Sequence, residues 1–211
     1  TPTFGRCPMA DDRVTKRLFD LLLAGLGLLL LSPLFIAIAA WIRLDTPGPA
    51  FFRQERVGRY GKIFRIHKFR TMAHDPGGSG PQITMPADSR VTRVGAWLRR
   101  SKLDELPQLI DVLRGDMSLV GPRPEVPRYV ALYSDELKDR VLSVRPGITD
   151  PVSLEFSNES EQLARAADPE REYREVLLPT KLRAAAAYVE RATFWTDLRV
   201  LGRTLCLLVR R

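Results

Sequence analysis

The hydrophobic pattern divides the chain into a long apolar segment, a mixed central region and an amphipathic tail. Residues 21–42 carry no charged side chain and read LLLAGLGLLLLSPLFIAIAAWI. As a helix rising ~1.5 Å per residue, this segment is long enough for the ~30 Å apolar core of a bilayer. Proline removes a backbone donor and clashes with the preceding turn, so Ser32 and Pro33 predict a kink. We therefore expect an apolar helix–break–helix over residues 14–45, after a tail at residues 1–13.

Two membrane arrangements fit this segment. Lys16 and Arg17 precede it and Arg43 follows it, and basic residues favour the cytoplasmic side of a membrane. A re-entrant hairpin that enters one leaflet and returns would put both basic ends on that side. A kinked spanning helix is the alternative, because proline is tolerated in spanning helices.

The tail predicts a second membrane contact. In residues 186–211, leucine and aromatic side chains recur at helical spacing and arginines accompany them. This combination is typical of an amphipathic helix lying among lipid headgroups. A terminal helix packed on the rest of the chain would show the same pattern, so both interpretations stay open.

Between these segments, residues 46–185 predict a helix-rich α/β domain with short strands. Residues 50–72 suggest two strands around a turn at Gly58–Gly61, and residues 73–90 form a long Gly/Pro-rich loop. The other expected elements are a helix over 92–101 with Val94, Trp97 and Leu98 inward, a helix over 104–115, a turn at 145–149 and a helix over 168–192 interrupted at Pro179.

Composition narrows the class of partner. The chain has 211 residues, 27% charged and 45% hydrophobic, which is typical of a folded protein. Its net charge of +8 favours an anionic partner such as nucleic acid, acidic lipid or a phosphorylated substrate. Cys7 and Cys206 are too far apart in the sequence for a zinc motif or a disulfide framework. Met9 resembles a natural start, so we expect residues 1–8 to be foreign to the natural chain.

The most informative pair of residues is Asp104 and Glu105, at the head of a predicted helix. Pro107 fits the first turn of that helix and Gly115 fits the position after its end. Acids at a helix start often do no more than interact with the helix dipole. The histidines, His67 and His74, lack partners at metal-ligand spacing, and we expect them to be ordinary strand and loop residues.

The cations around this pair favour a catalytic interpretation. Arg99, Arg100 and Lys102 precede the two acids, and Arg123 follows in a rigid GPRP turn that could close on the same side. A helix N-terminus ringed by arginine suits phosphate groups. A carboxylate among cations has a lowered pKa, can attack phosphorus, and can hold a divalent ion beside it. Residues Lys68 and Arg70 either line the same phosphate site or face water.

Several motifs, taken in order, resemble the bacterial sugar transferases, specifically the monotopic polyprenyl-phosphate phosphoglycosyl transferases. The likeness covers about Val14 to Arg211. Its motifs are KRLFD at 16–20, Ser32-Pro33, QERVGRYGKIFRIHKFRTM at 54–72, SRVTRVGAWLRRSKLDELPQL at 89–109, GDMSLVGPRPE at 115–125 and RPGIT at 145–149.

This resemblance implies a reaction at the membrane. Such enzymes move a sugar 1-phosphate from a UDP-sugar to undecaprenyl phosphate and release UMP, which begins assembly of a surface glycan. The aspartate of the pair, here Asp104, is implied to be the nucleophile that carries a covalent phosphosugar. Glu105 is implied to be a ligand of Mg²⁺. The enzyme is expected at the bacterial inner membrane with its catalytic domain, residues 46–185, on the cytoplasmic face.

The resemblance also assigns supporting residues. Phosphate or nucleotide contacts are expected from Arg99, Pro122, Arg123, Pro124 and Lys68, and we add Arg70 and Arg145 as expected substrate contacts. The Ser-Pro pair is implied to kink a re-entrant helix, which favours the hairpin. Two departures, Asp150-Pro151 after PGIT in place of the common glycine and Asp88-Ser89-Arg90 in place of Asp-Pro-Arg, leave the acidic pair intact.

Two other functions compete with the transferase. One is a membrane-bound binder of anionic ligands without catalysis, and the other is a phosphohydrolase that uses Asp104. We expect no nucleic-acid partner, because the aromatic residues sit mostly in the apolar segment and the tail rather than in a basic patch. The sequence identifies neither the sugar nor the glycan pathway, and it leaves the oligomeric state, a homo-oligomer included, open.

Overall fold

The architecture is helix-rich with two small sheets, as the sequence predicts. The computed structural model describes residues 10–73, 88–156 and 159–209. Its helices are α1 (Ala10–Asp45), α2 (Arg93–Ser101), α3 (Leu109–Arg114), α4 (Pro127–Val130), α5 (Asp135–Val141), α6 (Pro151–Glu155), α7 (Glu159–Arg165), α8 (Pro169–Glu172), α9 (Leu178–Arg191) and α10 (Phe194–Val209), with tighter turns η1 (Arg59–Gly61) and η2 (Leu103–Gln108), a π-helical turn η3 (Tyr173–Leu177) and strands β1 (Phe51–Val57), β2 (Ile63–Phe69), β3 (Ser118–Val120) and β4 (Gly147–Thr149). Residues 1–8 and most of the Gly/Pro-rich loop, His74 included, lie outside the described residues.

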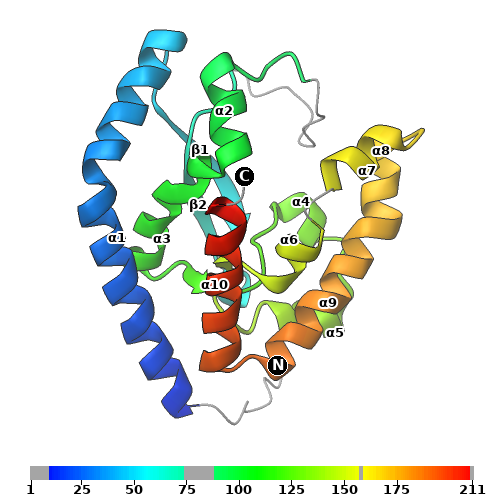
Figure 1. Cartoon of the computed structure of the whole chain (residues 1–211). Coiled ribbons are helices and arrows are strands. Elements are labelled where there is room, and N and C mark those ends of the chain that lie inside the picture. The colour runs from blue at the N-terminus through cyan, green and yellow to red at the C-terminus, as the bar shows by residue number, and fades with distance from the viewer. Residues whose placement is uncertain (1–9, 74–87, 157–158, 210–211) are drawn as a thin grey trace.

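The apolar segment forms one helix with a bend. Helix α1 contains Pro33, and Ser32 Oγ donates to the carbonyl of Leu29 at 2.8 Å. Figure 1 shows α1 bowed along its length, with its convex side facing away from the other elements. By length and composition, the part from Val14 to Asp45 suits a membrane, and 11% of its most apolar window is buried. The predicted kink is therefore a bend within a continuous helix, and the re-entrant topology stays a prediction.

Both arms of α1 pack on the rest of the chain. Ala24 lies in one core cluster with Val112 and Met117, and Ile38 and Ile42 lie in another with residues of β2 and α2. The opposite side of the helix is a row of exposed apolar side chains, among them Leu18, Leu22, Leu26, Leu29, Leu30 and Ile36. One face of α1 thus belongs to the core while the other is left uncovered by the described residues.

Polar bonds fasten the two ends of α1. Near its start, buried Asp20 accepts hydrogen bonds from Ser118 Oγ at 2.8 Å and from the Leu119 N–H at 3.2 Å. At its end, buried Arg70 of the β2 edge donates to the Thr46 carbonyl at 2.7 Å and to Thr46 Oγ1 at 3.1 Å. Both ends of the apolar helix are therefore tied to the same body.

The first sheet confirms the predicted hairpin. Strands β1 and β2 pair antiparallel from Phe51–Phe69 to Val57–Ile63, and η1 turns the chain with Tyr60 at φ 59°. The first half of β2 alternates between buried and exposed, but from His67 onward both faces are covered. This explains why polar and apolar residues do not separate cleanly along β2.

The second sheet corrects the expected turn at 145–149. Gly147–Thr149 is strand β4, which pairs parallel with β3 through Ser118–Gly147 and Val120–Thr149. A Cβ on Gly147 would lie 2.1 Å from the Gly121 backbone nitrogen, so glycine is required for the close approach. The turn was predicted from Pro and Gly alone, whereas the pairing partner lies about thirty residues earlier.

Three helix predictions also need correction. The helix expected over 104–115 is divided into η2, which contains Asp104, Glu105 and Pro107, and α3, which begins at Leu109. Trp97 is 39% exposed and packs on Trp41 with ring centroids 5.3 Å apart, so it does not point inward with Val94 and Leu98. The interruption between 168 and 192 is the π-helical turn at 173–177, and Pro179 sits in the first turn of α9.

The tail helix α10 packs on the rest of the chain, as one interpretation of the sequence predicts, and leaves another face exposed. Val200 is buried in the main core cluster and Thr204 Oγ1 lies 2.9 Å from Thr149 Oγ1. Trp195, Leu198 and Leu205 are exposed. The helix begins at Phe194, because residues up to Arg191 belong to α9. Contact of its exposed face with lipid stays a prediction.

Candidate active site

Three segments that are distant in the sequence bring the candidate residues together. Asp104 and Glu105 lie in η2, directly after Lys102, whose left-handed φ of 58° ends α2 and redirects the chain. Strand β2 supplies Lys68, and the GPRP turn after β3 supplies Arg123. The predicted closure of this turn on the acidic pair is present in the structure.

Glu105 is held by two cations. Its Oε1 lies 2.8 Å from Lys68 Nζ, its Oε2 lies 3.1 Å from Arg123 Nη1, and Arg123 Nη2 also donates to Oε1. Burial raises the pKa of Glu105, but the charges of Arg123 and Lys68 outweigh burial and hold it well below its usual range. Glu105 is therefore a fixed carboxylate with both oxygens engaged.

Asp104 has the opposite environment. Its side chain is buried, and no residue in the described part of the chain donates a hydrogen bond to it. Burial and the charge of Glu105 raise its pKa, while Lys68, Lys102 and Arg99 oppose them. The expected lowering of the pKa is thus right for Glu105 and wrong for Asp104. Strongly perturbed acids in such surroundings often mark functional sites.

Arg99 approaches the acidic pair from α2. Its Nε donates to Thr71 Oγ1 at 2.8 Å, and Gly95, one turn earlier, allows α2 to touch the Thr71 backbone. Burial lowers the pKa of Arg99, whereas the charges of Asp104 and Asp88 raise it. Asp88 is itself paired with Arg90, which lowers its pKa to about 2. Arg99 therefore remains a cation within electrostatic reach of Asp104, as predicted.

The two prolines of GPRP set the turn that carries Arg123. Pro122 and Pro124 are buried. The Pro122 carbonyl accepts from the Gly147 N–H at 3.0 Å, and the Pro124 carbonyl accepts from Arg56 Nη1 at 2.9 Å. The turn is therefore fastened to β4 on one side and to β1 on the other, which fixes the position of Arg123.

Two predicted substrate contacts lie elsewhere. The Arg70 guanidinium is occupied by carbonyls of residues 42, 46 and 47 at the end of α1. Arg145 donates from Nε to the Gly115 carbonyl at 2.9 Å and lines a different cavity. The structure brings neither residue to the acidic pair, so their contact with substrate stays a prediction.

Several residues near the site carry no local sequence signal. Tyr173 donates from its hydroxyl to Glu125 Oε1 at 2.6 Å across 48 positions. A small cavity of about 40 Å³ adjoins Arg123 and is lined by Asp150 and Lys181, among others. Gln108, directly after Pro107, is buried, and its amide nitrogen has no hydrogen-bond partner among the residues that the structure describes. The fold alone reveals Tyr173, Asp150 and Lys181, because they lie in other segments, whereas Gln108 lies in η2 with the acidic pair.

His67 is a structural residue in β2, as expected. Its Nδ1 lies 2.5 Å from Asp111 Oδ1, and its backbone N–H donates to Asp111 Oδ2 at 2.8 Å. Both residues are buried. The pair joins β2 to α3 and thus supports the strand that carries Lys68.

The carboxylates of the acidic pair suit a magnesium ion whose remaining ligands come from substrate and water. Within the described ranges, no three His, Cys, Asp or Glu residues cluster as a metal site. Mg²⁺ typically binds one or two carboxylates and takes its other ligands from water and phosphate oxygens. The adjacent carboxylates of Asp104 and Glu105 fit that pattern.

The comparisons with known proteins all identify sugar transferases. A family model described as "Bacterial sugar transferase" matches residues 11–211. The chain is 37% identical over 192 residues to the "UDP-N-acetylgalactosamine-undecaprenyl-phosphate N-acetylgalactosaminephosphotransferase" of Aeromonas hydrophila, covering 90% of this chain and 42% of that protein. It is 36% identical over 206 residues to the "UDP-glucose:undecaprenyl-phosphate glucose-1-phosphate transferase" of Caulobacter vibrioides, covering 95% of this chain and 72% of that protein.

A third relative, like the Aeromonas protein, is much longer than this chain. The chain is 37% identical over 195 residues to the "UDP-glucose:undecaprenyl-phosphate glucose-1-phosphate transferase" of Xanthomonas campestris, covering 90% of this chain and 38% of that protein. The chain thus spans less than half the length of the Aeromonas and Xanthomonas proteins. The similar relatives are named for different sugars.

Proposed function

The chain belongs to the bacterial sugar transferase family, and from that premise we propose that it transfers a sugar 1-phosphate from a UDP-sugar to undecaprenyl phosphate, releasing UMP. The names of the relatives support this reaction. The observation that carries the proposal is the difference between the two acids. Lys68 and Arg123 donate hydrogen bonds to Glu105, whereas Asp104 is buried and accepts no hydrogen bond from the described residues.

In the proposed first half-reaction, Asp104 acts as the nucleophile. A carboxylate oxygen forms a bond to the β-phosphorus of the UDP-sugar, and the bond from that phosphorus to the bridging oxygen breaks. UMP leaves with the bridging oxygen and its electron pair. Arg99 balances negative charge on the phosphoryl group, because it already lies within electrostatic reach of Asp104.

In the second half-reaction, undecaprenyl phosphate takes the sugar phosphate. A phosphate oxygen of the lipid attacks the same phosphorus, and the bond to Asp104 breaks, which restores the carboxylate. Lys68 and Arg123 keep Glu105 ionised and oriented throughout. Glu105 would hold Mg²⁺, which would supply positive charge to the transferring phosphoryl group.

The position of α1 supports a membrane-surface arrangement. A spanning helix puts its ends on opposite sides of a bilayer, but here both ends of α1 are tied to one body through Asp20 and Arg70. Its uncovered leucine row would face lipid. We therefore propose the re-entrant hairpin at the cytoplasmic face of the inner membrane.

Cysteine labelling tests this topology. After Cys7 and Cys206 are changed to serine, single cysteines replace Val14 and Leu44, which are both exposed. In sealed cells, an impermeant thiol reagent should label neither site, and both should react after the membrane is opened. Labelling of one site alone in sealed cells would contradict the hairpin.

The reaction itself is tested by UMP release from a panel of UDP-sugars. Enzyme with Mg²⁺ and UDP-sugar, but without lipid, should release at most one UMP per enzyme and gain the mass of a sugar phosphate. Asp104→Asn should abolish both signals, and the exposed acid Asp139→Asn should leave them unchanged. Release that requires undecaprenyl phosphate from the start, with no adduct, would favour direct transfer in a ternary complex.

The same assay separates the competing functions. A binder without catalysis releases no UMP with any sugar or lipid. A phosphohydrolase releases nucleotide over many turnovers without a lipid acceptor. The transferase requires the lipid for every turnover after the first.

A further inference from the structure

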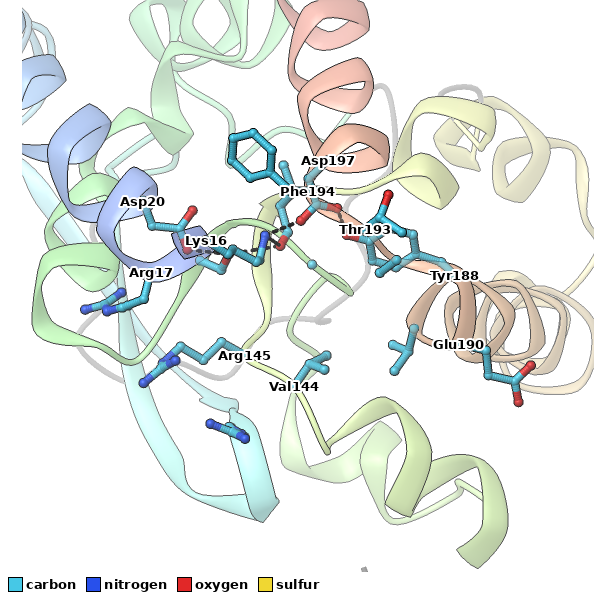
Figure 2. Close-up of a pocket in the computed structure, with 16 residues that line it drawn as sticks. Lys16, Arg17, Asp20, Val144, Arg145, Tyr188, Glu190, Thr193, Phe194 and Asp197 are labelled. Carbon is cyan, nitrogen blue, oxygen red and sulfur yellow. Dashed lines mark hydrogen bonds and ion pairs between the residues drawn. The ribbon is translucent and has the colours of Figure 1, made fainter. Parts of the chain in front are cut away.

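A second charged cavity lies apart from the acidic pair. It measures about 220 Å³ and is lined by the start of α1, by residues around β3 and β4, and by the junction of α9 and α10. Figure 2 shows its lining, and in Figure 1 the start of α1 and the junction of α9 and α10 lie at the same end of the molecule. None of Lys68, Arg99, Asp104, Glu105 or Arg123 lines it.

The acids in this cavity already have partners. Asp197 is paired with Lys16 and accepts from the Tyr188 hydroxyl at 2.5 Å. Asp20 accepts from Ser118 and Leu119, as described above. The third acid, Glu190, is paired with Arg140, which does not line the cavity. Asp197 and Glu190 are thus each paired with a cation, whereas the donors to Asp20 are neutral and Asp20 keeps its charge, which attracts Arg17 and Arg145.

Two arginines have no such partner. Arg17 reaches only the carbonyls of Met117 and Leu113, at 3.4 and 3.5 Å, and Arg145 donates from Nε to the Gly115 carbonyl. No ion pair joins either side chain to a carboxylate in residues 10–73, 88–156 or 159–209. Figure 2 shows both guanidinium groups on the same side of the cavity. Burial and the charge of Arg17 lower the pKa of Arg145, while the charge of Asp20 opposes them.

Two neighbouring, partly buried guanidinium groups repel each other, and Asp20 supplies one negative charge against the two positive charges of Arg17 and Arg145. Guanidinium groups bind phosphate oxygens through paired N–H donors, so a phosphate group would both balance the charge and use the free donors. Arg59 adds a further cation to the lining. The electrostatics of the cavity thus favour a phosphate.

The rest of the lining is apolar. Val144, Val189, Ala192 and Phe194 form part of the wall. Exposed hydrophobic side chains flank it in the sequence, with Leu18 beside Arg17 and Trp195 beside Phe194. The volume is below the ~300–1,000 Å³ typical of whole-ligand pockets, so it suits a headgroup whose apolar tail lies outside.

We propose that this cavity binds the phosphate group of a lipid, at a site separate from Asp104 and Glu105. Arg17 and Arg145 bind the phosphate oxygens, and the apolar chain lies along the exposed side chains of α1 and α10. The proposal does not depend on the transfer reaction. The lipid phosphate can come from a phospholipid or from a polyprenyl phosphate, and the experiment distinguishes the two.

The test measures binding by native mass spectrometry on the full chain in mild detergent. The probes are dihexanoyl phosphatidic acid, dihexanoyl phosphatidylcholine and inorganic phosphate. We expect one phosphatidic acid bound per chain, with protection from hydrogen exchange in residues 142–147 and 188–194. If phosphatidylcholine binds as tightly as phosphatidic acid, the negative charge of the headgroup does not determine binding. If inorganic phosphate binds as tightly, the apolar chains do not contribute to binding. Either result overturns the proposal.

Substitutions identify the site. Arg17→Gln should weaken phosphatidic acid binding at least about tenfold, because a charge-assisted contact is lost, while exposed Arg183→Gln should leave it unchanged. Arg145→Lys retains the charge but loses the paired N–H donors, so it should weaken binding, though less than Arg17→Gln does. Since the backbone contacts of Arg17 are long, Arg17→Gln should also keep the thermal midpoint of the lipid-free protein. Unchanged binding in folded Arg17→Gln would overturn the proposal.

Competition identifies the source of the phosphate. Undecaprenyl phosphate should displace phosphatidic acid in wild-type protein and in Asp104→Asn alike, because the site is separate from the nucleophile. If it displaces the probe at far lower concentration than phospholipid does, the site selects a polyprenyl phosphate. If displacement is lost in Asp104→Asn, the two lipids meet at the acidic pair and the separate site is refuted.

Discussion

Replacing Gly95 by alanine tests whether the close packing of α2 on the end of β2 sets the position of Arg99. A Cβ at Gly95 would lie 2.0 Å from the Thr71 carbonyl oxygen and 2.7 Å from Thr71 Cα, against 3.4 Å for ordinary contact. These atoms belong to the backbone, so no side chain can rotate away. Helix α2 must therefore move by about 1.4 Å, the shortfall of the closest contact.

The expected cost follows from two opposing effects. Overpacking a well-packed site costs about 1–3 kcal/mol, and glycine to alanine within a helix regains up to ~1 kcal/mol. Gly202 of α10 is the matched control, because no atom lies within 4 Å of its would-be Cβ. We expect Gly95→Ala to lower the thermal midpoint by several degrees and Gly202→Ala to raise it by about 2–4 °C.

Activity should fall more than stability. Arg99 lies one helical turn after Gly95, so the same displacement lengthens its 2.8 Å bond to Thr71 Oγ1 and shifts the guanidinium from Asp104. A misplacement of about 1 Å can cost on the order of 10²-fold in rate. UMP release by folded protein measures this loss. A Gly95→Ala enzyme with wild-type stability and rate would refute the reasoning, because α2 could then not be fixed by this contact.

Three further substitutions separate structural from catalytic roles. Arg70→Met should destabilise the protein by at least about 3 kcal/mol, since it removes several charge-assisted bonds to the end of α1; an unchanged thermal midpoint with a raised KM would make Arg70 a substrate residue instead. Asp20→Ala should cost about 1–3 kcal/mol by leaving the buried Leu119 N–H without its acceptor, measured as a lower midpoint in the same detergent. Tyr173→Phe should cost a similar amount through lost bonding to Glu125, and unfolding that matches wild type would contradict this.

The sequence predicts those parts of the fold that short-range signals control. Glycine and the alternation of residues around Gly58–Gly61 indicate the β1–β2 hairpin, and Gly115, with φ 89°, ends α3 as expected. Pro33 predicts the bend in α1 for the same reason, because a missing backbone donor acts within one turn. Each of these signals acts between residues that are close in the chain.

Other features depend on partners that the local sequence does not identify. Gly147–Thr149 is a strand only because β3 lies beside it. The sequence around Arg70 would suit a phosphate ligand, yet its guanidinium donates to the carbonyl of Thr46 at the end of α1. Trp97 follows helical spacing but meets Trp41 at the surface. In each case a contact across twenty or more positions decides the outcome.

The acidic pair shows why the site could be located from the sequence while its electrostatics could not. Asp104 and Glu105 are adjacent, so any argument from nearby charge treats them alike. In a turn of about three residues, however, consecutive side chains point roughly 120° apart. Glu105 consequently meets Lys68 and Arg123, while Asp104 meets buried surface and the negative charge of its neighbour. A carboxylate whose oxygens are both engaged is a poor nucleophile, and an unengaged one is better placed to form a bond. The direction of the two side chains, rather than their identity, therefore separates the proposed nucleophile from the proposed metal ligand.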